Sequence, residues 1–155
     1  MVLLVLMIAM ILSRRVMMND NDLQTLARRA IACKRWRWLP GMLADTGLRI
    51  VRHDSDGYLV GYYANHAYIS TCTNDVWTDA PDNTVDCLPD FRDPATLGCL
   101  LALVREAWQN PYAYVDYSNK WKVAFCCNVG PRAFSSTTEA AAIVAALEAA
   151  PFTSV

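Results

Sequence analysis

Glycine and histidine are scarce in this chain, and their scarcity excludes several kinds of active site. Its 155 residues include six glycines and two histidines, His53 and His66. The sequence therefore holds neither a glycine-rich phosphate-binding loop nor a dinucleotide-binding fingerprint. Ser70, Ser135 and Ser136 lack the flanking glycines of a nucleophile elbow. We expect no catalytic residue, no cofactor and no enzymatic activity; a small enzyme of unknown class stays open only as an alternative.

Metal-ligating residues also do not gather at a recognisable spacing. His53 is followed by Asp54 and Asp56, and imidazole with carboxylate suits zinc or manganese, but only proximity supports such a site. The run 54–57, Asp-Ser-Asp-Gly, begins like a calcium loop but lacks the glutamate at the twelfth position. The same four residues are typical of a hairpin turn. We therefore expect no bound metal.

The chain has little net charge of either sign. Fourteen lysines and arginines stand against fifteen aspartates and glutamates, which gives a formal net charge of −1. This balance offers no general attraction to nucleic acid or to a membrane surface. The distribution is uneven, with five basic residues in 28–37 and six aspartates in 75–93. Because the aspartates are irregularly spaced, we interpret 73–93 as a solvated acidic loop.

No disulfide framework is recognisable. The six cysteines, at positions 33, 72, 87, 99, 126 and 127, follow neither the spacing of a small secreted domain nor that of paired zinc knuckles. Small buried side chains with free thiols account for them. We therefore expect free thiols and a cytoplasmic protein.

Residues 1–18 form an apolar N-terminal extension. The run 1–12 is shorter than the roughly 20 residues that a helix needs to cross a bilayer. Two arginines follow the run instead of preceding it, which is the wrong order for an export signal. Since five of the six methionines lie in 1–18, our first interpretation is a natural start at Met17 or Met18. A membrane or interfacial anchor and a core-packing helix stay open, and without an anchor at 1–12 we expect no membrane partner.

Helix signals occur at three places in the remaining chain. The apolar spacing over 23–31 predicts a first helix, capped by Asn21 or Asp22 and ending within 33–37. A cap and a first-turn proline at 93–94 predict a second helix.

The last helix is predicted from a capping box. Ser136 is followed three residues later by Glu139, and an alanine-rich apolar stripe continues to Pro151. We therefore expect a third helix from Ser136 onward.

Alternating and β-rich runs predict two hairpins and one further short strand. The expected strands lie at 48–52, 58–63, 67–71, 112–117 and 120–127. Gly130 and Pro131 should end the second hairpin. Because hairpins pair locally, we expect a single α+β domain over 19–151, with a mainly antiparallel sheet, helices packed on it and the order α-β-β-(β)-α-β-β-(β)-α.

Four stretches of the chain share a pattern with one family. They are Leu23-Gln24-Thr25-Leu26-Ala27 leading into Cys33-Lys34-Arg35-Trp36, the helix start Asp93-Pro94-Ala95-Thr96-Leu97, the strand Trp121-x-Val123-x-Phe125, and the alanine-rich helix 139–150. Together with the element order they resemble the phage ABA sandwich domain, found in small proteins of tailed bacteriophages and prophages. The resemblance implies α-β-α sandwich-like layering, a phage or prophage origin and the cytoplasm of a bacterial host. It implies no activity and carries over no functional residue.

One basic and aromatic segment is a candidate contact site for nucleic acid. It consists of Lys34, Arg35, Trp36, Arg37 and Trp38. Cationic groups neutralise phosphates, and indole rings stack on unpaired bases. The structural alternative is that arginine stems pack over tryptophan at a helix end, where the helix dipole favours cations.

Tyrosines are concentrated in the expected strands and indicate a second candidate site. Alternate residues of a strand must face away from the helices, and we select Tyr62 and Tyr114 as candidate contact residues. Ordinary strand propensity is the alternative explanation. We therefore expect a non-enzymatic phage or prophage accessory protein that binds another macromolecule, foremost a protein. Weak nucleic-acid binding through 34–38 is the alternative, and the sequence leaves the partner and the oligomeric state open.

Overall fold

The chain folds into helices packed on antiparallel strands, as a computed structural model describes for residues 18–53, 59–62, 72–73, 76–77, 85–127 and 130–151. The described elements are α2 (Asp20–Ile31), β1 (Arg49–His53), β2 (Leu59–Tyr62), β3 (Cys72–Thr73), β4 (Val76–Trp77), β5 (Val85–Asp86), α3 (Pro94–Ala107), β6 (Tyr114–Tyr117), β7 (Trp121–Cys127), β8 (Gly130–Ser136) and α4 (Glu139–Glu148). The predicted α+β fold class is confirmed. The expectations for residues 1–17, the turn at 54–57 and the strand at 67–71 lie outside the described residues.

Helix α2 confirms the predicted first helix but starts earlier. Asn19 caps it, and its side-chain oxygen accepts the Asp22 amide at 2.8 Å. The expected cap at Asn21 or Asp22 is wrong, because Asn19 is an equally good cap and the earlier start places two aspartates in the first turn, where the helix dipole favours them. The helix also ends before the expected window 33–37. Its buried residues are Leu26, Ala27 and Ala30.

Helix α3 begins where the sequence predicts. Asp93 caps it by accepting the Thr96 amide at 2.9 Å, and Pro94 occupies the first turn, where no amide donor is needed. At the other end, the Trp108 indole donates to the Ala146 carbonyl at 2.8 Å. This bond ties α3 to α4.

Helix α4 is capped by Thr138, whose hydroxyl oxygen accepts the Ala141 amide at 3.3 Å. The predicted cap at Ser136 is wrong, because Ser136 still pairs with Trp121 in the sheet and its backbone belongs to β8. Most of the helix is buried, which fits its alanine-rich composition. The buried residues are Ala140, Ala142, Ile143, Val144, Ala146 and Leu147.

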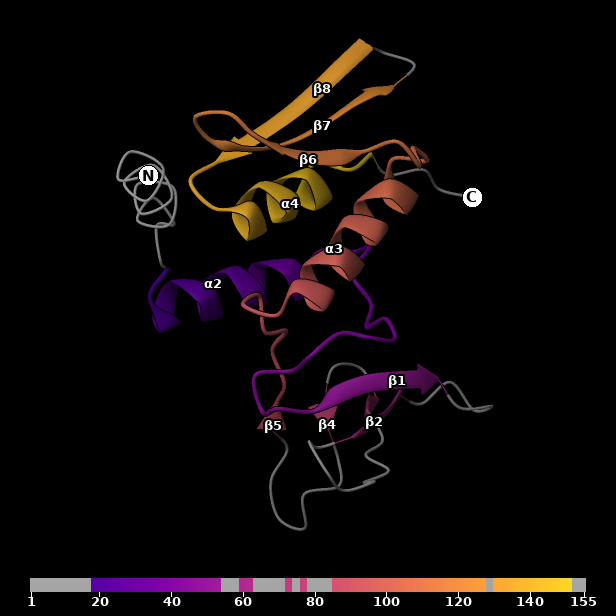
Figure 1. Cartoon of the computed structure of the whole chain (residues 1–155). Helices are drawn as coiled ribbons and strands as arrows, with labels where there is room; N and C mark the ends of the chain where they lie inside the picture. The colour runs from indigo at the N-terminus through magenta and orange to yellow at the C-terminus, as the bar shows by residue number, and fades with distance from the viewer. Residues whose placement is uncertain are drawn as a thin grey trace, which may run out of the picture.

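The largest described sheet has the order β6-β7-β8, and both pairings are antiparallel. The predicted hairpin of 112–117 with 120–127 is confirmed as β6 with β7. Gly130 and Pro131 do not end the hairpin; instead they begin β8, since Gly130 adopts a φ of +104° that suits glycine and then pairs with Cys127. Helix α4 lies against one face of this sheet (Figure 1).

The remaining strands are short. β1 and β2 form the first predicted hairpin, which is confirmed, with an irregularity between Ile50 and Arg52. β3, β4 and β5 form a small antiparallel sheet. The interpretation of 73–93 as one long loop is therefore wrong in part, because β4, β5 and the last residue of β3 fall inside that range.

Hydrogen bonds join residues 43–45 to residues 88–90, and we call this pairing the clamp. It lies where the chain passes between the helices and the strands β1 to β5. Ala44 forms an antiparallel bridge with Pro89. The Asp45 amide donates to the Leu88 carbonyl at 2.8 Å, and the Leu88 amide donates to the Asp45 carboxylate at 3.1 Å. The Asp90 amide also donates to the Leu43 carbonyl at 2.8 Å. Residues 43–45 and 88–90 are thus held side by side.

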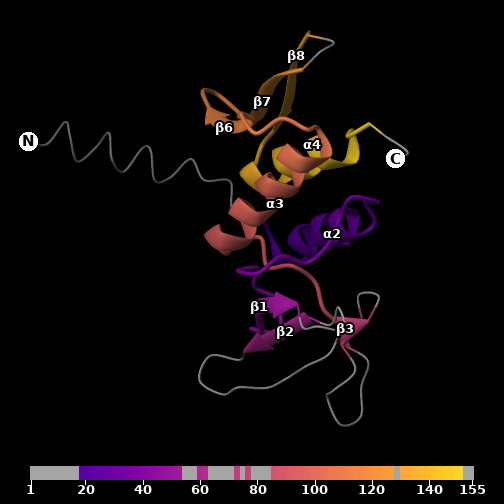
Figure 2. The same ribbon diagram turned by 90° about the vertical axis from the view of Figure 1, so that its right-hand side faces the viewer.

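The elements form layers that both views show (Figures 1 and 2). The β6–β8 sheet lies at one end, the three helices follow, and β1 with its neighbouring strands lies at the other end. The resemblance implies α-β-α layering, with helices on both sides of a sheet. Within the described residues, no helix covers the second side of the β6–β8 sheet. One side of this sheet therefore remains uncovered by described elements.

A single hydrophobic core connects these layers. It runs from Leu48 and Ile50 beside β1, through α2 and α3, to Val123 and Phe125 of β7. Thr96 is the one polar residue that is buried among those described. No helix in the described ranges has the length and apolar character needed to cross a membrane.

Candidate functional site

The outer sheet face is the side of the β6–β8 sheet that points away from α4. Neighbouring residues of a strand point to opposite sides, and Val123 and Phe125 of β7 are buried on the helix side. The residues that alternate with them therefore point outward, together with their register partners. The outer sheet face consists of Tyr114, Asp116, Lys122, Ala124, Cys126, Pro131, Ala133 and Ser135.

Two tyrosines stand out from this face. Tyr114 is 52% exposed, and Tyr112, which precedes β6, is 84% exposed. Asn110 fixes the turn that presents Tyr112: its side-chain oxygen accepts the Tyr112 amide at 2.9 Å, and its side-chain amide donates to the Cys126 carbonyl. Tyr117 differs, because its ring packs on Trp121 with centroids 5.0 Å apart. Tyr112 and Tyr114 are therefore available for contacts.

An open hollow of ≈ 570 Å³ lies on this face, within the range of roughly 300–1,000 Å³ that ligand pockets have. Tyr112, Tyr114, Ala124 and Ala133 are among the residues that line it. The hollow exists because register places the large Tyr114 in one row with these two alanines. Pro131 also lines the hollow.

One ion pair lies on the outer sheet face. The Lys122 ammonium lies 3.5 Å from the Asp116 carboxylate, and their side chains are 34% and 45% exposed. Because the pair is solvated, it contributes about 0–1 kcal/mol to stability. Arg132, which is exposed, also lines the hollow, so a positive charge lies beside this pair.

The second predicted residue, Tyr62, is not brought to this face. It ends β2 and pairs with Arg49, at the opposite end of the molecule from β6 (Figure 1). The structure describes the backbone of Tyr62 and not its side chain. The structure therefore does not join Tyr62 and Tyr114 in one site.

The basic and aromatic segment 34–38 is largely occupied by internal contacts. Arg37 forms two hydrogen bonds with the Glu106 carboxylate, at 2.8 and 2.5 Å. These bonds, with the positive charge of Arg37, hold the pKa of Glu106 below its usual range. Arg35 donates to the Pro151 carbonyl at 3.4 Å. Both arginines thus serve to connect this segment to α3 and to the chain after α4.

The two tryptophans of the segment face inward. Trp38 is 2% exposed and belongs to the core, while Trp36 packs on the edge of the core. Their rings meet edge to face, with centroids 5.7 Å apart and planes at 74°. An indole that lies in the core cannot stack on a base, so Trp38 is unavailable for nucleic-acid contact.

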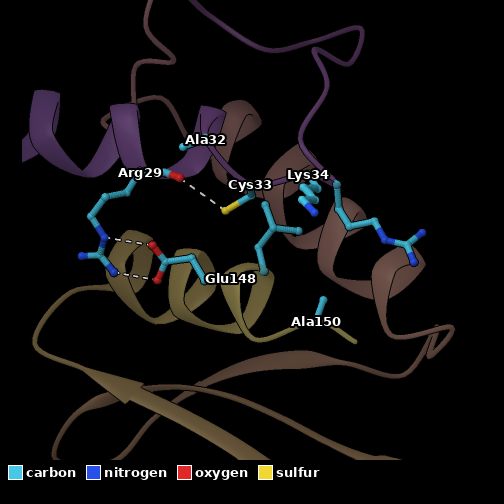
Figure 3. Close-up of a pocket in the computed structure, with 8 residues that line it drawn as sticks. Arg29, Ala32, Cys33, Lys34, Glu148 and Ala150 are labelled. Atoms are coloured by element: carbon cyan, nitrogen blue, oxygen red, sulfur yellow. Dashed lines mark hydrogen bonds and ion pairs between the residues drawn. The ribbon is translucent and has the colours of Figure 1, made fainter. Parts of the chain in front are cut away.

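A second hollow, of ≈ 420 Å³, lies where the ends of α2 and α4 meet (Figure 3). Lys34 and Arg35 line it, and Arg29 forms a bidentate ion pair across it with Glu148, at 2.9 and 2.7 Å. The Cys33 thiol donates to the Arg29 carbonyl at 3.3 Å, and burial raises the pKa of this thiol. Two helix C-termini carry partial negative charge here, so the cations stabilise the fold and the site does not favour an anion.

A third hollow lies beside α2, and the acidic side chains that line it have hydrogen-bond or ion-pair partners within the protein. It measures ≈ 210 Å³. Asp20 pairs with Arg92, whose backbone amide donates to the Asp90 carboxylate at 2.9 Å, and the Asp45 carboxylate accepts the Leu88 amide. Within the described ranges no group of three or more histidine, cysteine or acidic residues is arranged to hold a metal ion.

A half-buried polar network joins β1 to the start of α3. The Arg49 guanidinium binds the Asp93 carboxylate at 2.9 and 3.2 Å and the Gly41 carbonyl at 2.7 Å. The Thr96 hydroxyl donates to Asp93 at 2.9 Å and accepts the Leu43 amide at 2.8 Å. Hydrogen bonds from Arg49, and then those from Thr96, lower the pKa of Asp93. These bonds hold β1 against the start of α3. The Arg49 guanidinium, the Asp93 carboxylate and the Thr96 hydroxyl are all bonded to one another or to the backbone, so the network has a structural role.

Sequence reasoning missed the small residues of the outer sheet face. Ala124, Pro131 and Ala133 attract no attention by type, although the alternation of β7 already indicates which residues oppose the buried side. Cys33, Cys87, Cys99 and Cys126 are free thiols, as expected for those four.

Comparison with known proteins gives no relative. No protein family, no curated protein and no solved structure matches this chain. The resemblance to the phage ABA sandwich domain therefore stays a prediction.

Proposed function

We propose that this chain acts without catalysis, by binding another protein through the outer sheet face. The observation that supports the proposal is the exposure of Tyr112 and Tyr114 beside a hollow on a sheet face that no described helix covers. Tyrosine presents a rigid, amphipathic ring and is enriched in protein interfaces. A phage or prophage origin and a bacterial cytoplasmic setting belong to the same proposal and have the sequence resemblance as their support.

Contact groups of two kinds are present on this face. The tyrosine rings and the alanines offer apolar surface, and the phenol hydroxyls with Ser135 offer hydrogen bonds at the rim. An apolar centre with a polar rim is the usual anatomy of a protein interface. Nucleic-acid binding has less support, because Arg37 and Trp38 are occupied by Glu106 and the core.

Site-specific photo-crosslinking tests the proposal. A photoreactive residue is placed at Ala133 on the outer sheet face and, as a matched control, at Ala102, an exposed alanine of α3. In bacterial lysate we expect a defined crosslinked protein band at Ala133 and not at Ala102. Combining Ala133 labelling with Tyr112→Ser and Tyr114→Ser should remove the band. Crosslinks that persist in the double variant, or that form equally at Ala102, would contradict the proposal.

A salt titration tests the nucleic-acid alternative. Each phosphate contact that is lost releases about one counterion fewer, so a true binder shows a flatter salt dependence after Arg35→Ala and Arg37→Ala. We expect no measurable binding of single- or double-stranded nucleic acid by either protein. Salt-sensitive binding that the two substitutions abolish would favour the alternative.

A further inference from the structure

We propose that the hollow on the outer sheet face binds an acidic peptide segment of a partner protein, in which a carboxylate lies next to an apolar or aromatic side chain. This inference rests on the proposed function and specifies the chemistry of the partner. The reason is that the described residues lining the hollow include two cations and two tyrosines but no carboxylate. A partner that complements this lining carries negative charge and apolar surface side by side.

Arg132 is the cation that is open to a partner. It lies in β8, an edge strand of the sheet, and it is exposed. It pairs with Phe125 and so starts on the helix side of β8, but at this edge it also lines the hollow. Among the described residues, none forms an ion pair or a hydrogen bond with the Arg132 side chain. Its guanidinium is therefore available to bind a carboxylate through two parallel hydrogen bonds.

Lys122, the second cation of the hollow, already has a partner. Its ammonium lies 3.5 Å from the carboxylate of Asp116, which is not among the lining residues. This pair balances its own charge, so the positive charge of Arg132 is left without a counterpart. A single carboxylate from a partner would provide that counterpart and would not have to compete with an internal acid for it.

The apolar part of the lining determines what lies next to the carboxylate. The rings of Tyr112 and Tyr114 are open to solvent, and Ala124 and Ala133 leave space beside them. An apolar or aromatic side chain of the partner would lose its contact with water against these four residues. The phenol hydroxyls are donors that can add hydrogen bonds to the same carboxylate.

The size and charge of the hollow favour a peptide over nucleic acid. A volume of ≈ 570 Å³ is typical of a pocket for a small ligand, so a short segment enters it. Single-stranded nucleic acid also stacks on aromatic rings, but it needs a positively charged groove that follows its phosphates. One cation without a counterpart matches one carboxylate and not a run of phosphates. Because the contact is small, we expect a dissociation constant in the micromolar range.

Selection from a library of random peptides on the immobilised full chain tests the inference. We expect the bound peptides to be enriched in aspartate and glutamate next to apolar or aromatic residues. Arg132→Gln should remove the enrichment of acidic residues and keep that of apolar residues. Arg28→Gln is the matched control, because it removes the same charge from an exposed arginine of α2. It should select the same peptides as the wild type.

Fluorescence anisotropy with one enriched acidic peptide measures the contribution of Arg132. Arg132→Gln should raise the dissociation constant about tenfold, because a charged hydrogen-bonded pair is lost. Added salt should weaken binding by the wild type more than binding by this variant. Arg132→Glu should prefer the same peptide with lysine in place of its acidic residues, since the charge of the hollow is then reversed. Thermal unfolding checks that each variant folds, and the reversed preference itself requires a folded protein.

Several results would overturn the inference. They are a library that yields no enriched peptide, enrichment of neutral or basic peptides, and acidic enrichment that Arg132→Gln leaves unchanged. Tighter binding of oligothymidylate, a single-stranded nucleic acid, than of the enriched peptide would also overturn it. If one of these results is found while a partner still crosslinks at Ala133 in lysate, the proposed function stands with a partner of different chemistry. If the crosslink is absent as well, the proposed function fails too.

Discussion

Residues 34–38 and the outer sheet face differ in how much of their chemistry is still available. The segment 34–38 combines cations and indoles, yet Arg37 is bound to Glu106 and Trp38 lies in the core. The outer sheet face has fewer charged residues and no indole, yet Tyr114 on it and Tyr112 beside it are open to solvent. Residue type indicates what a group can do, whereas internal partners decide whether the group is free to do it. The following predictions measure that difference.

The largest effect is expected for the indole of the basic and aromatic segment. Trp38→Ala removes a side chain that is 2% exposed and should lower the free energy of unfolding by about 3–5 kcal/mol. Urea denaturation followed by circular dichroism measures the loss. A loss below about 1 kcal/mol would mean that Trp38 is not part of the core and would restore it as a candidate contact residue.

A smaller effect is expected at the half-buried polar network of Arg49, Asp93 and Thr96. The pKa of Asp93 is lowered by Arg49 and Thr96, so its contribution to stability is present above the unfolded pKa of about 3.9 and is lost as pH falls through the folded pKa. Asp93→Asn keeps a capping side chain but removes the charge, and should cost about 1–3 kcal/mol at neutral pH. Urea unfolding between neutral and acidic pH should show a shallower pH dependence for the variant. Identical pH profiles would show that the ion pair with Arg49 is not formed.

The ion pair of Arg37 with Glu106 should have a small effect on the free energy of unfolding and a clear effect on the pKa of Glu106. Its side chains are 48% and 56% exposed, so Arg37→Ala should cost no more than about 1 kcal/mol. The same change should raise the pKa of Glu106, which NMR titration of its carboxyl group can follow. Arg28→Ala, at another exposed arginine, is the control and should leave that pKa unchanged. An unshifted pKa in Arg37→Ala would break the comparison, because Arg37 would then be free.

The smallest effect is expected on the outer sheet face. Tyr112→Ser with Tyr114→Ser removes rings that are mostly exposed, so the free energy of unfolding should change by no more than about 0.5 kcal/mol for each ring. Thermal and urea unfolding measure this, alongside the crosslinking at Ala133. A large loss of stability would mean that the tyrosines support the fold, and loss of crosslinking would then have no functional meaning.

Local signals were the part of the fold that the sequence could predict. Asp93 and Pro94 define the start of α3 without help from distant residues, and both hairpins follow from alternation and turns. The predicted helix caps were wrong where several residues that can cap a helix are neighbours in the sequence. Thr138 replaces Ser136 because pairing with β7 keeps Ser136 in the strand, and that pairing is a tertiary property.

The candidate site was predictable only in part for the same reason. Alternation predicts that some strand tyrosines are exposed, and Tyr114 is one of them. Knowing that α4 covers only one side of β7 requires the packed structure. The pairing of Arg37 with Glu106, 69 residues apart, carries no local signal either, and it is this contact that changes the interpretation of residues 34–38.

The clamp between 43–45 and 88–90 makes the chain between them a permissive insertion point. Because both ends are held together by backbone hydrogen bonds, the enclosed chain leaves and re-enters the body at one place, and doubling its length costs only about 0.6 kcal/mol of closure entropy. The sequence of 54–84 can lengthen, shorten or diverge while the opposite end of the molecule keeps its shape, whereas Leu48 and Ile50, which the clamp also encloses, belong to the core. Replacing 54–84 with a short glycine- and serine-rich linker should therefore preserve cooperative unfolding and crosslinking at Ala133. Loss of cooperative unfolding and of crosslinking would show that the clamp is stable only with residues 54–84 present. Changes in 54–84 would then also affect the β6–β8 end of the molecule.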